Sequence, residues 1–150
     1  MLRRLKRGIL LFWALWFSVV VLTNVLDGLK AVHALPAGWT FASGNYELML
    51  KIMAVHGTPA PVVAGLFVGV ILWEGLATVL FWRGFRAWPG GIAGIDSAFI
   101  VGLALWAAFA LADEIFLAYS IEAVHLRLFG LQLLSLLALR LLPDAPASSA

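Results

Sequence analysis

The sequence contains no cysteine. A chain without thiols forms no disulfide bond, and it offers no thiolate ligand for zinc or an iron–sulfur cluster and no cysteine nucleophile. Charged residues are also scarce, since they make up 12% of the 150 residues, whereas soluble domains carry about 25%. With 63% hydrophobic residues, a water-exposed globule of this length would lack a polar coat. The composition therefore indicates a single-domain membrane protein.

Signs of nucleotide or nucleic-acid chemistry are missing as well. The net charge is only +2, and the basic residues form no stripe interleaved with exposed aromatic residues, so we expect no nucleic-acid partner. No glycine-rich phosphate-binding loop occurs, and no serine lies in a sequence typical of a hydrolase nucleophile. We therefore predict no catalytic residue.

Four apolar segments are long enough to cross a bilayer, whose hydrocarbon core needs about 20 helical residues. They cover residues 9–26, 62–82, 97–118 and 121–142. Backbone polar groups in lipid must be satisfied internally, and no segment alternates like a barrel strand, so these segments are predicted to be α-helices. The predicted fold is all-α: an up-down four-helix membrane bundle in residues 1–142, with a disordered cytoplasmic tail in residues 143–150.

The longest predicted connection lies between the first two spans. Within it, Ser43, Gly44 and Asn45 precede a short amphipathic helix predicted at about residues 46–55. Glu47 and Lys51 are four residues apart and are expected to form a surface pair on this helix. We expect the helix to lie along the outer membrane surface.

Basic residues predict the orientation. With four spans, seven of the ten basic residues fall on the same side of the membrane: Arg3, Arg4, Lys6, Arg7, Arg83, Arg86 and Arg140. By the positive-inside rule, both termini are expected in the cytoplasm. Gly65 and Gly69 form a small-xxx-small pattern that predicts close helix packing on the second span.

Polar residues within or beside the spans form the candidate site: Asn24, Asp27, Glu74, Glu114, Glu122, His125, Arg127 and Gln132. Charges at membrane depth are costly, and they usually face the bundle interior and pair with one another. If Gly8 and Arg83 are level ends of the first two spans, the helical rise places Glu74 near mid-membrane with Gln132 and Ser18. The other candidates then lie nearer the outer face.

Several candidates have a structural alternative. Asp113, Glu122 and Arg127 are also explained as interfacial residues that reach water. Asp113 and Glu114 are about 100° apart on a helix, so they cannot share a partner. A structural ion pair between Glu114 and Arg127 is as well supported as a functional role. For Glu74, the structural alternative is a hydrogen bond to Gln132 or Ser18.

The fourth span contains one possible metal or cofactor pattern. Glu122, His125 and Gln132 lie on one helical stripe, whereas Arg127 is about 200° from His125 and points elsewhere. A Glu-x-x-His step occurs in di-iron bundles, but such sites need two copies and two further carboxylates. Haem b with two histidine ligands needs a second histidine at membrane depth, and His125 is the only histidine within a span. We therefore predict no metal or cofactor, and quinone or haem b near His125 stays an alternative.

Five short motifs occur in order along the chain: Asn24-Val-Leu-Asp27, Gly44-Asn45-Tyr46, Glu74-Gly75-Leu76, Glu114-Ile115-Phe116 and Arg127-Leu128-Phe129. With these motifs the chain resembles the bacterial "predicted small integral membrane proteins", a four-helix family of unknown function. The resemblance implies the same topology and groups Asn24, Asp27, Glu74, Glu114 and Arg127 as one set. The chain departs from the family in a shorter connection between the last two spans and in Asp113, where the family tends to have a small residue.

Three functional hypotheses follow. The first is a non-enzymatic accessory or interaction subunit of a larger inner-membrane complex, with a membrane-protein partner or a second copy beside it in the lipid bilayer. The second is a small-molecule or ion binding or transport module that uses the Glu74 carboxyl. The third is a redox membrane anchor that holds quinone or haem.

Overall fold

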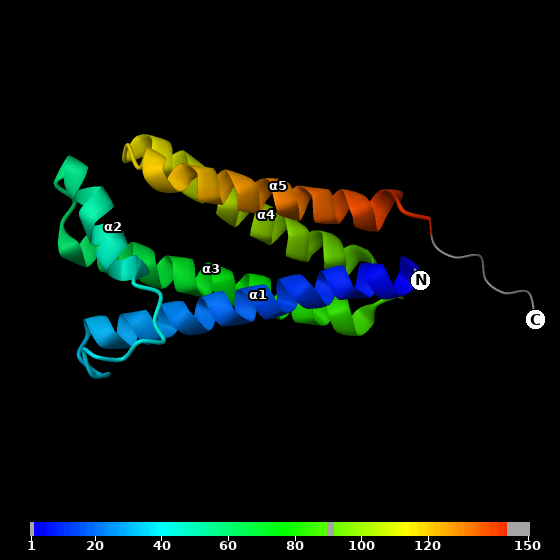
Figure 1. Ribbon diagram of the computed structural model, residues 1–150, viewed down its shortest axis with the longest axis horizontal. Helices are drawn as coiled ribbons and strands as arrows, with labels where there is room; N and C mark the ends of the chain where they lie inside the picture. The colour runs from blue at the N-terminus through cyan, green and yellow to red at the C-terminus, as the bar shows by residue number, and fades with distance from the viewer. Residues whose placement is uncertain (1, 90–91, 144–150) are drawn as a thin grey trace, which may run out of the picture.

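The computed structural model describes residues 2–89 and 92–143, and all of its regular structure is helical. The elements are α1 (Leu2–Ala31), α2 (Asn45–Met53), the 3-10 helix η1 (Ala54–His56), α3 (Ala60–Ala87), α4 (Ile92–Ile115) and α5 (Tyr119–Leu141). The long helices alternate in direction along one axis, and α2 lies at the end opposite the N-terminus (Figure 1). Residues 144–150 of the predicted tail lie outside the described residues.

The long helices confirm the predicted membrane bundle. Each of the four has the length and hydropathy needed to cross a bilayer. The first two long helices continue past the predicted spans, 9–26 and 62–82, to residues 2–31 and 60–87. Proline suits the start of α3, where a missing backbone N–H has no intrahelical acceptor to lose. Lys30 in the last turn of α1 complements the negative end of the helix dipole.

The α4–α5 connection is a tight turn centred on Leu117. The Ala118 N–H donates to the Asp113 carbonyl at 2.7 Å, and the Leu117 N–H donates to the Glu114 carbonyl at 3.3 Å. This pair of bonds is a Schellman motif, in which the residue after the helix adopts the left-handed conformation that glycine favours. Here that residue is leucine, with φ of 56°. The turn occupies residues 116–118, between the end of α4 at Ile115 and the start of α5 at Tyr119, whereas the predicted spans are 97–118 and 121–142.

The core is an aromatic cluster between α1, α3 and α4. The Phe17 ring is stacked on Phe81 at 5.5 Å and on Trp106 at 5.6 Å between centroids. Phe99 meets the edge of Phe81 at 5.1 Å. These rings are all but fully buried, and buried aromatic pairs contribute about 0.5–1.5 kcal/mol each beyond their area. The cluster therefore sets the register of α1 against α3 and α4.

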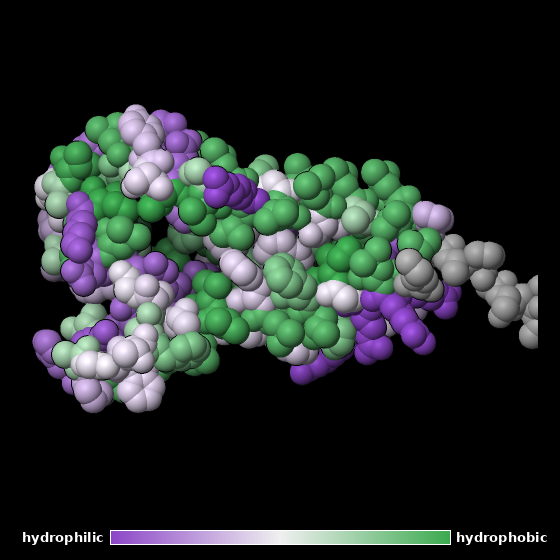
Figure 2. Space-filling view, in the orientation of Figure 1, coloured by the Kyte–Doolittle hydropathy of each residue, from purple (hydrophilic) through white to green (hydrophobic). Residues whose placement is uncertain are grey.

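The surface between the two ends of the bundle is largely apolar (Figure 2). It suits contact with lipid, because a hydrocarbon environment does not penalise exposed leucine and valine. Gly65 and Gly69 lie on this surface, with open space where a Cβ would be. The prediction that they pack against another helix of the bundle is therefore wrong. Close packing occurs instead at Gly102 of α4, where a Cβ would lie 2.5 Å from the Gln132 side chain of α5.

The predicted basic residues gather at one end of the bundle. The Lys6 ammonium at the start of α1 lies 5.8 Å from the Trp88 ring, just after α3. At the end of α5, Arg140 forms an ion pair with Asp96 of α4. The start of α1, the end of α3 and the end of α5 are thus neighbours, and we call this the basic end. The opposite end, which carries α2, is the α2 end.

Candidate functional site

The centre of the candidate site is a buried contact between α1 and α3. The side-chain amide nitrogen of Asn24 donates to both carboxylate oxygens of Glu74, at 2.9 Å and 2.8 Å. Asn24 is 1% exposed and Glu74 is 2% exposed. A buried carboxylate is costly unless its oxygens are hydrogen-bonded, and this amide satisfies one acceptor site on each oxygen. The chain thereby joins two helices by a polar contact inside the bundle.

The expected partners of Glu74 were different. Ser18 is occupied elsewhere, because its hydroxyl donates to the Ala14 carbonyl and accepts the Trp82 indole N–H at 2.9 Å. The error lies in the assumed level of the two helices. Phe17 stacks on Phe81. Seven residues later in α1 and seven residues earlier in α3, Asn24 meets Glu74. Arg83 is therefore level with about residue 15 of α1 rather than with Gly8.

The side-chain oxygen of Asn24, Oδ1, links this contact to the segment outside the spans. The exposed Asn45, the first residue of α2, donates from its side-chain amide to that oxygen at 2.8 Å. The Ser43 N–H donates to the Thr23 carbonyl at 3.2 Å. A chain of hydrogen bonds therefore runs from the exposed Asn45 through Asn24 to Glu74.

Asp27 holds the start of α2. Its Oδ2 accepts the Tyr46 N–H at 2.8 Å and the Ser43 hydroxyl at 3.2 Å. The N-cap residue of α2 is Gly44, which has no side chain to bind the free N–H groups of the first turn. Asp27 of α1 supplies that missing acceptor, and its negative charge suits the positive end of the α2 dipole. We call Asn24, Asp27, Ser43, Asn45 and Glu74 the α2 latch.

The far end of the α2–η1 segment reaches the other half of the bundle. A ring nitrogen of His56 lies 2.7 Å from the Ile115 carbonyl oxygen at the end of α4. The last carbonyls of a helix lack intrahelical donors, so a donating His56 nitrogen satisfies one of them. The His56 ring also lies 5.4 Å from the Phe116 ring. The segment therefore bridges α1 and α4 across the α2 end. The predicted Glu47–Lys51 pair on α2 is confirmed at 3.0 Å.

A second polar contact joins α4 and α5. The Nδ1 atom of His125 lies 2.5 Å from the Asp113 carboxylate, and the Phe109 ring lies 4.9 Å from the imidazole. Asp113 is 4% exposed, so its interpretation as an interfacial residue that reaches water is wrong. The tight turn at Leu117 places the two side chains opposite each other, twelve residues apart in sequence.

The remaining predicted residues do not join these contacts. Glu114 and Arg127 are exposed, and the ion pair expected between them is not found in residues 2–89 and 92–143. Glu122 is half-buried and lies within hydrogen-bonding reach of Glu114. Gln132 is fully buried against Gly102, and neither of its polar atoms has a hydrogen-bond partner in the described part of the chain. The expected bond between Gln132 and Glu74 is therefore absent there.

Sequence reasoning left Asp113, Ser43 and Asn45 out of the site. Asp113 was recognisable as an ionisable residue within a span, but its facing depended on the turn that follows it. Among the described residues, no group of three or more histidine, aspartate or glutamate side chains is placed to hold a metal ion.

No protein-family model, curated protein sequence or solved structure matches this chain. What the geometry decides is the broad class, because four helices have the length and hydropathy to cross a bilayer. The chain is a multi-pass membrane protein. Its buried polar contacts lie between helices of this membrane bundle, with Asn24 and Glu74 between α1 and α3, and Asp113 and His125 between α4 and α5.

Proposed function

We propose that the protein is a non-catalytic accessory subunit of a bacterial inner-membrane assembly, and that it binds a helix of its partner through α5. The observation that carries the proposal is the sparse packing of α5. Only 11% of its most apolar window is buried, whereas the windows of the other three long helices are 22–33% buried. The α2 latch and the aromatic cluster hold α1 to α2, α3 and α4, which leaves α5 as the helix with the most free surface.

One face of α5 combines exposed apolar residues with a charge. Val124, Arg127, Leu131 and Leu134 recur at spacings of three and four residues, so they share a face. The three apolar residues are 49%, 56% and 62% exposed. Arg127 lies eight residues into the helix, about 12 Å from its start. It has no acidic partner in the part of the chain that the structure describes.

Charge complementarity identifies the kind of partner. An arginine at this depth is costly in lipid unless it is paired or reaches the interface. A carboxylate on a neighbouring transmembrane helix would compensate the charge, and the flanking leucines would supply the packing contacts that associate helices in a bilayer. The partner we propose is therefore a membrane protein with an acidic residue at the level of Arg127.

The absence of cysteine allows a clean test. A single cysteine at Leu134, on the proposed face, is compared with one at Leu72 of α3, which is 69% exposed on another helix. After cross-linking in native membranes, we expect a discrete heteromeric adduct from Leu134→Cys and none from Leu72→Cys. Adding Arg127→Gln to Leu134→Cys is expected to reduce the yield of the adduct.

Other outcomes of this test contradict the proposal. Equal patterns from both positions would show that α5 contacts lipid and random neighbours only. An adduct of twice the chain mass from Leu134→Cys would replace the accessory role by self-association. Purification in mild detergent that returned only a monomer would also contradict the accessory role.

The orientation in the membrane also belongs to this proposal. We infer that both termini are cytoplasmic, and the seven basic residues at the basic end support this orientation by the positive-inside rule. The α2 end then faces the periplasm. The resemblance to the bacterial small integral membrane proteins fits this proposal, because Asn24, Asp27 and Glu74 of its residue set fall within the α2 latch. Glu114 and Arg127 of the same set lie outside it.

One observation favours a second candidate, a binding or transport module. The hydrogen-bond chain from the exposed Asn45 to Glu74 gives the buried carboxyl a polar connection to the surface. Two of its three members are amides, however, which do not pass a proton on without tautomerising. Proton flux into vesicles tests this candidate: a flux that Glu74→Gln abolishes would favour it over the accessory role.

The third candidate is a redox anchor with quinone or haem beside His125. The Nδ1 atom of His125 is hydrogen-bonded to Asp113. The other two histidines, His33 and His56, lie at the α2 end, outside α1 and α3 to α5. An absorption spectrum with a Soret band, or quinone extracted from the purified protein, would support this candidate.

A further inference from the structure

Two hollows open at the basic end of the bundle. The larger has a volume of about 420 Å³ and is lined by Arg83, Arg86, Ala87 and Gly94. The smaller has a volume of about 230 Å³ and is lined by Arg3, Arg4, Arg7, Trp88 and Pro89. The larger hollow is open at the surface rather than enclosed, so it suits a headgroup that stays partly in water. Among the described residues that line the two hollows, the charged side chains are all arginines, which suits an anion.

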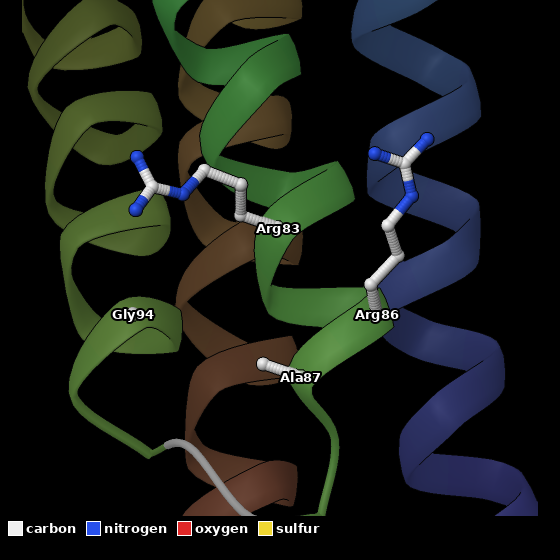
Figure 3. A pocket seen from close by; sticks show the side chains of 4 residues that line it. All are labelled: Arg83, Arg86, Ala87 and Gly94. Atoms are coloured by element: carbon white, nitrogen blue, oxygen red, sulfur yellow. The ribbon is translucent and has the colours of Figure 1, made fainter.

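The two arginines of the larger hollow diverge from the end of α3. Figure 3 shows Arg83 reaching toward α4 and Arg86 toward α1, and both side chains lean back along α3. This direction follows from helix geometry, because side chains tilt toward the N-terminal end of their helix. The guanidinium groups therefore lie back from the end of α3, toward its apolar part.

The charge of these arginines is not neutralised within the described residues. Asp96, the acidic residue in the first turns of α4, is engaged by Arg140. Neither Arg83 nor Arg86 has an acidic partner in residues 2–89 and 92–143. Arg86 lies over the Trp82 ring at 5.8 Å, which orients its guanidinium without changing its charge.

A lipid is distinguished from a free anion by the surface next to the hollow. Leu72, Leu76 and Val79 precede Arg83 by eleven, seven and four residues, so they continue its face along α3. They are 69%, 51% and 54% exposed. This apolar track leads from Arg83 toward the middle of the membrane, where it suits an acyl chain. We propose that the Arg83–Arg86 hollow binds the headgroup phosphate of an anionic phospholipid.

The test uses the full chain reconstituted in phosphatidylcholine vesicles with spin-labelled phosphatidylglycerol or phosphatidylcholine as the probe. Each basic residue at a membrane surface is worth roughly a fivefold preference for an anionic lipid. We therefore expect Arg83→Gln/Arg86→Gln to remove most of the preference of the bound lipid for phosphatidylglycerol. A matched control, Lys30→Gln/Lys51→Gln, loses the same charge at the α2 end and is expected to keep it.

A conservative variant separates binding from folding. Arg83→Lys/Arg86→Lys keeps the charge and is expected to keep most of the preference, even if the glutamine variant folds poorly. An unchanged preference in the glutamine variant would overturn the proposal, as would an equal loss in the Lys30/Lys51 control. Displacement of the spin-labelled lipid by inorganic phosphate at low concentration would also overturn it, because it would indicate a site for a free anion.

Discussion

The Asn24 amide faces the Glu74 carboxylate in one orientation, with its nitrogen toward the carboxylate oxygens. Glu74 takes two hydrogen bonds from the Asn24 nitrogen, at 2.9 Å and 2.8 Å, while the Asn24 oxygen accepts from Asn45 at 2.8 Å. A carboxylate only accepts hydrogen bonds, so Glu74 takes the nitrogen side of the Asn24 amide and leaves its oxygen side to the Asn45 NH2 group. The donors therefore all point from the outer surface toward Glu74, and α1, α2 and α3 are joined by this one chain.

The fixed direction predicts that glutamine is a poor replacement for Glu74. Glu74→Gln puts an NH2 group in place of one carboxylate oxygen that accepts from the Asn24 nitrogen, so that hydrogen bond is lost and two NH2 groups face each other. One buried donor then lacks an acceptor, which costs about 1–3 kcal/mol. Unfolding in detergent micelles, followed by circular dichroism, measures this loss. A glutamine variant as stable as the parent would contradict the assigned geometry.

Asp27 is predicted to control the order of α2. In Asp27→Ala the Tyr46 N–H loses its acceptor, as in the loss of an N-cap, which costs about 0.5–2 kcal/mol. Hydrogen exchange at the Tyr46 amide should accelerate by roughly tenfold, while exchange in the core of α3 stays unchanged. Glu47→Ala is the control, since it removes an exposed pair with Lys51 that is worth little. Equal exchange in both variants would mean that Asp27 does not hold α2.

The sequence was sufficient to predict the class, the number and direction of the spans, and the short helix before the second span. These features follow from hydropathy and periodicity, which are local. The contact between Asn24 and Glu74 was missed because it depends on how far α1 slides along α3. That register is set by the Phe17–Phe81 stack, and no pattern in either helix encodes it.

The other errors have related causes. Gly65 and Gly69 match a packing motif, but a motif does not say which face of α3 meets another helix. The assignment of Asp113 to the membrane interface was wrong, because its burial depends on the turn at Leu117. His125 and Gln132 were predicted on one stripe of α5, and both side chains face α4. The predicted contact between Gln132 and Glu74 is not found.

Leu117 is predicted to strain the α4–α5 turn. A left-handed conformation costs a non-glycine residue about 1–2 kcal/mol. Glycine removes this cost, but it loses more backbone entropy on folding, which offsets part of the stabilisation. Leu117→Gly, at a side chain that is 56% exposed, should therefore stabilise the protein by about 0.5–1 kcal/mol. Leu111→Gly, in the interior of α4, should destabilise it by about 1 kcal/mol. Loss of stability in both variants would contradict the assigned backbone conformation.

Gly102 is predicted to be the glycine that the bundle cannot replace. In Gly102→Ala the added Cβ would lie 2.5–2.9 Å from three atoms of the buried Gln132 side chain, so overpacking should cost about 1–3 kcal/mol. Adding Gln132→Ala should recover much of this loss. Gly69→Ala, where nothing lies within 4 Å, is the control and should be neutral or stabilising. Thermal unfolding of the variants makes the comparison, and equal effects at Gly102 and Gly69 would exclude the close contact.

The most direct test of the account is a double-mutant cycle on Asn24 and Glu74, measured as free energies of unfolding in detergent micelles. If the pair is a structural contact, Asn24→Leu and Glu74→Leu alone each leave a buried polar group without its partner and cost about 1–3 kcal/mol. The double variant replaces both groups and should recover most of the loss, with a coupling energy of about 1–3 kcal/mol. Additive costs with no coupling would contradict the account, because the two side chains would then not be held by each other.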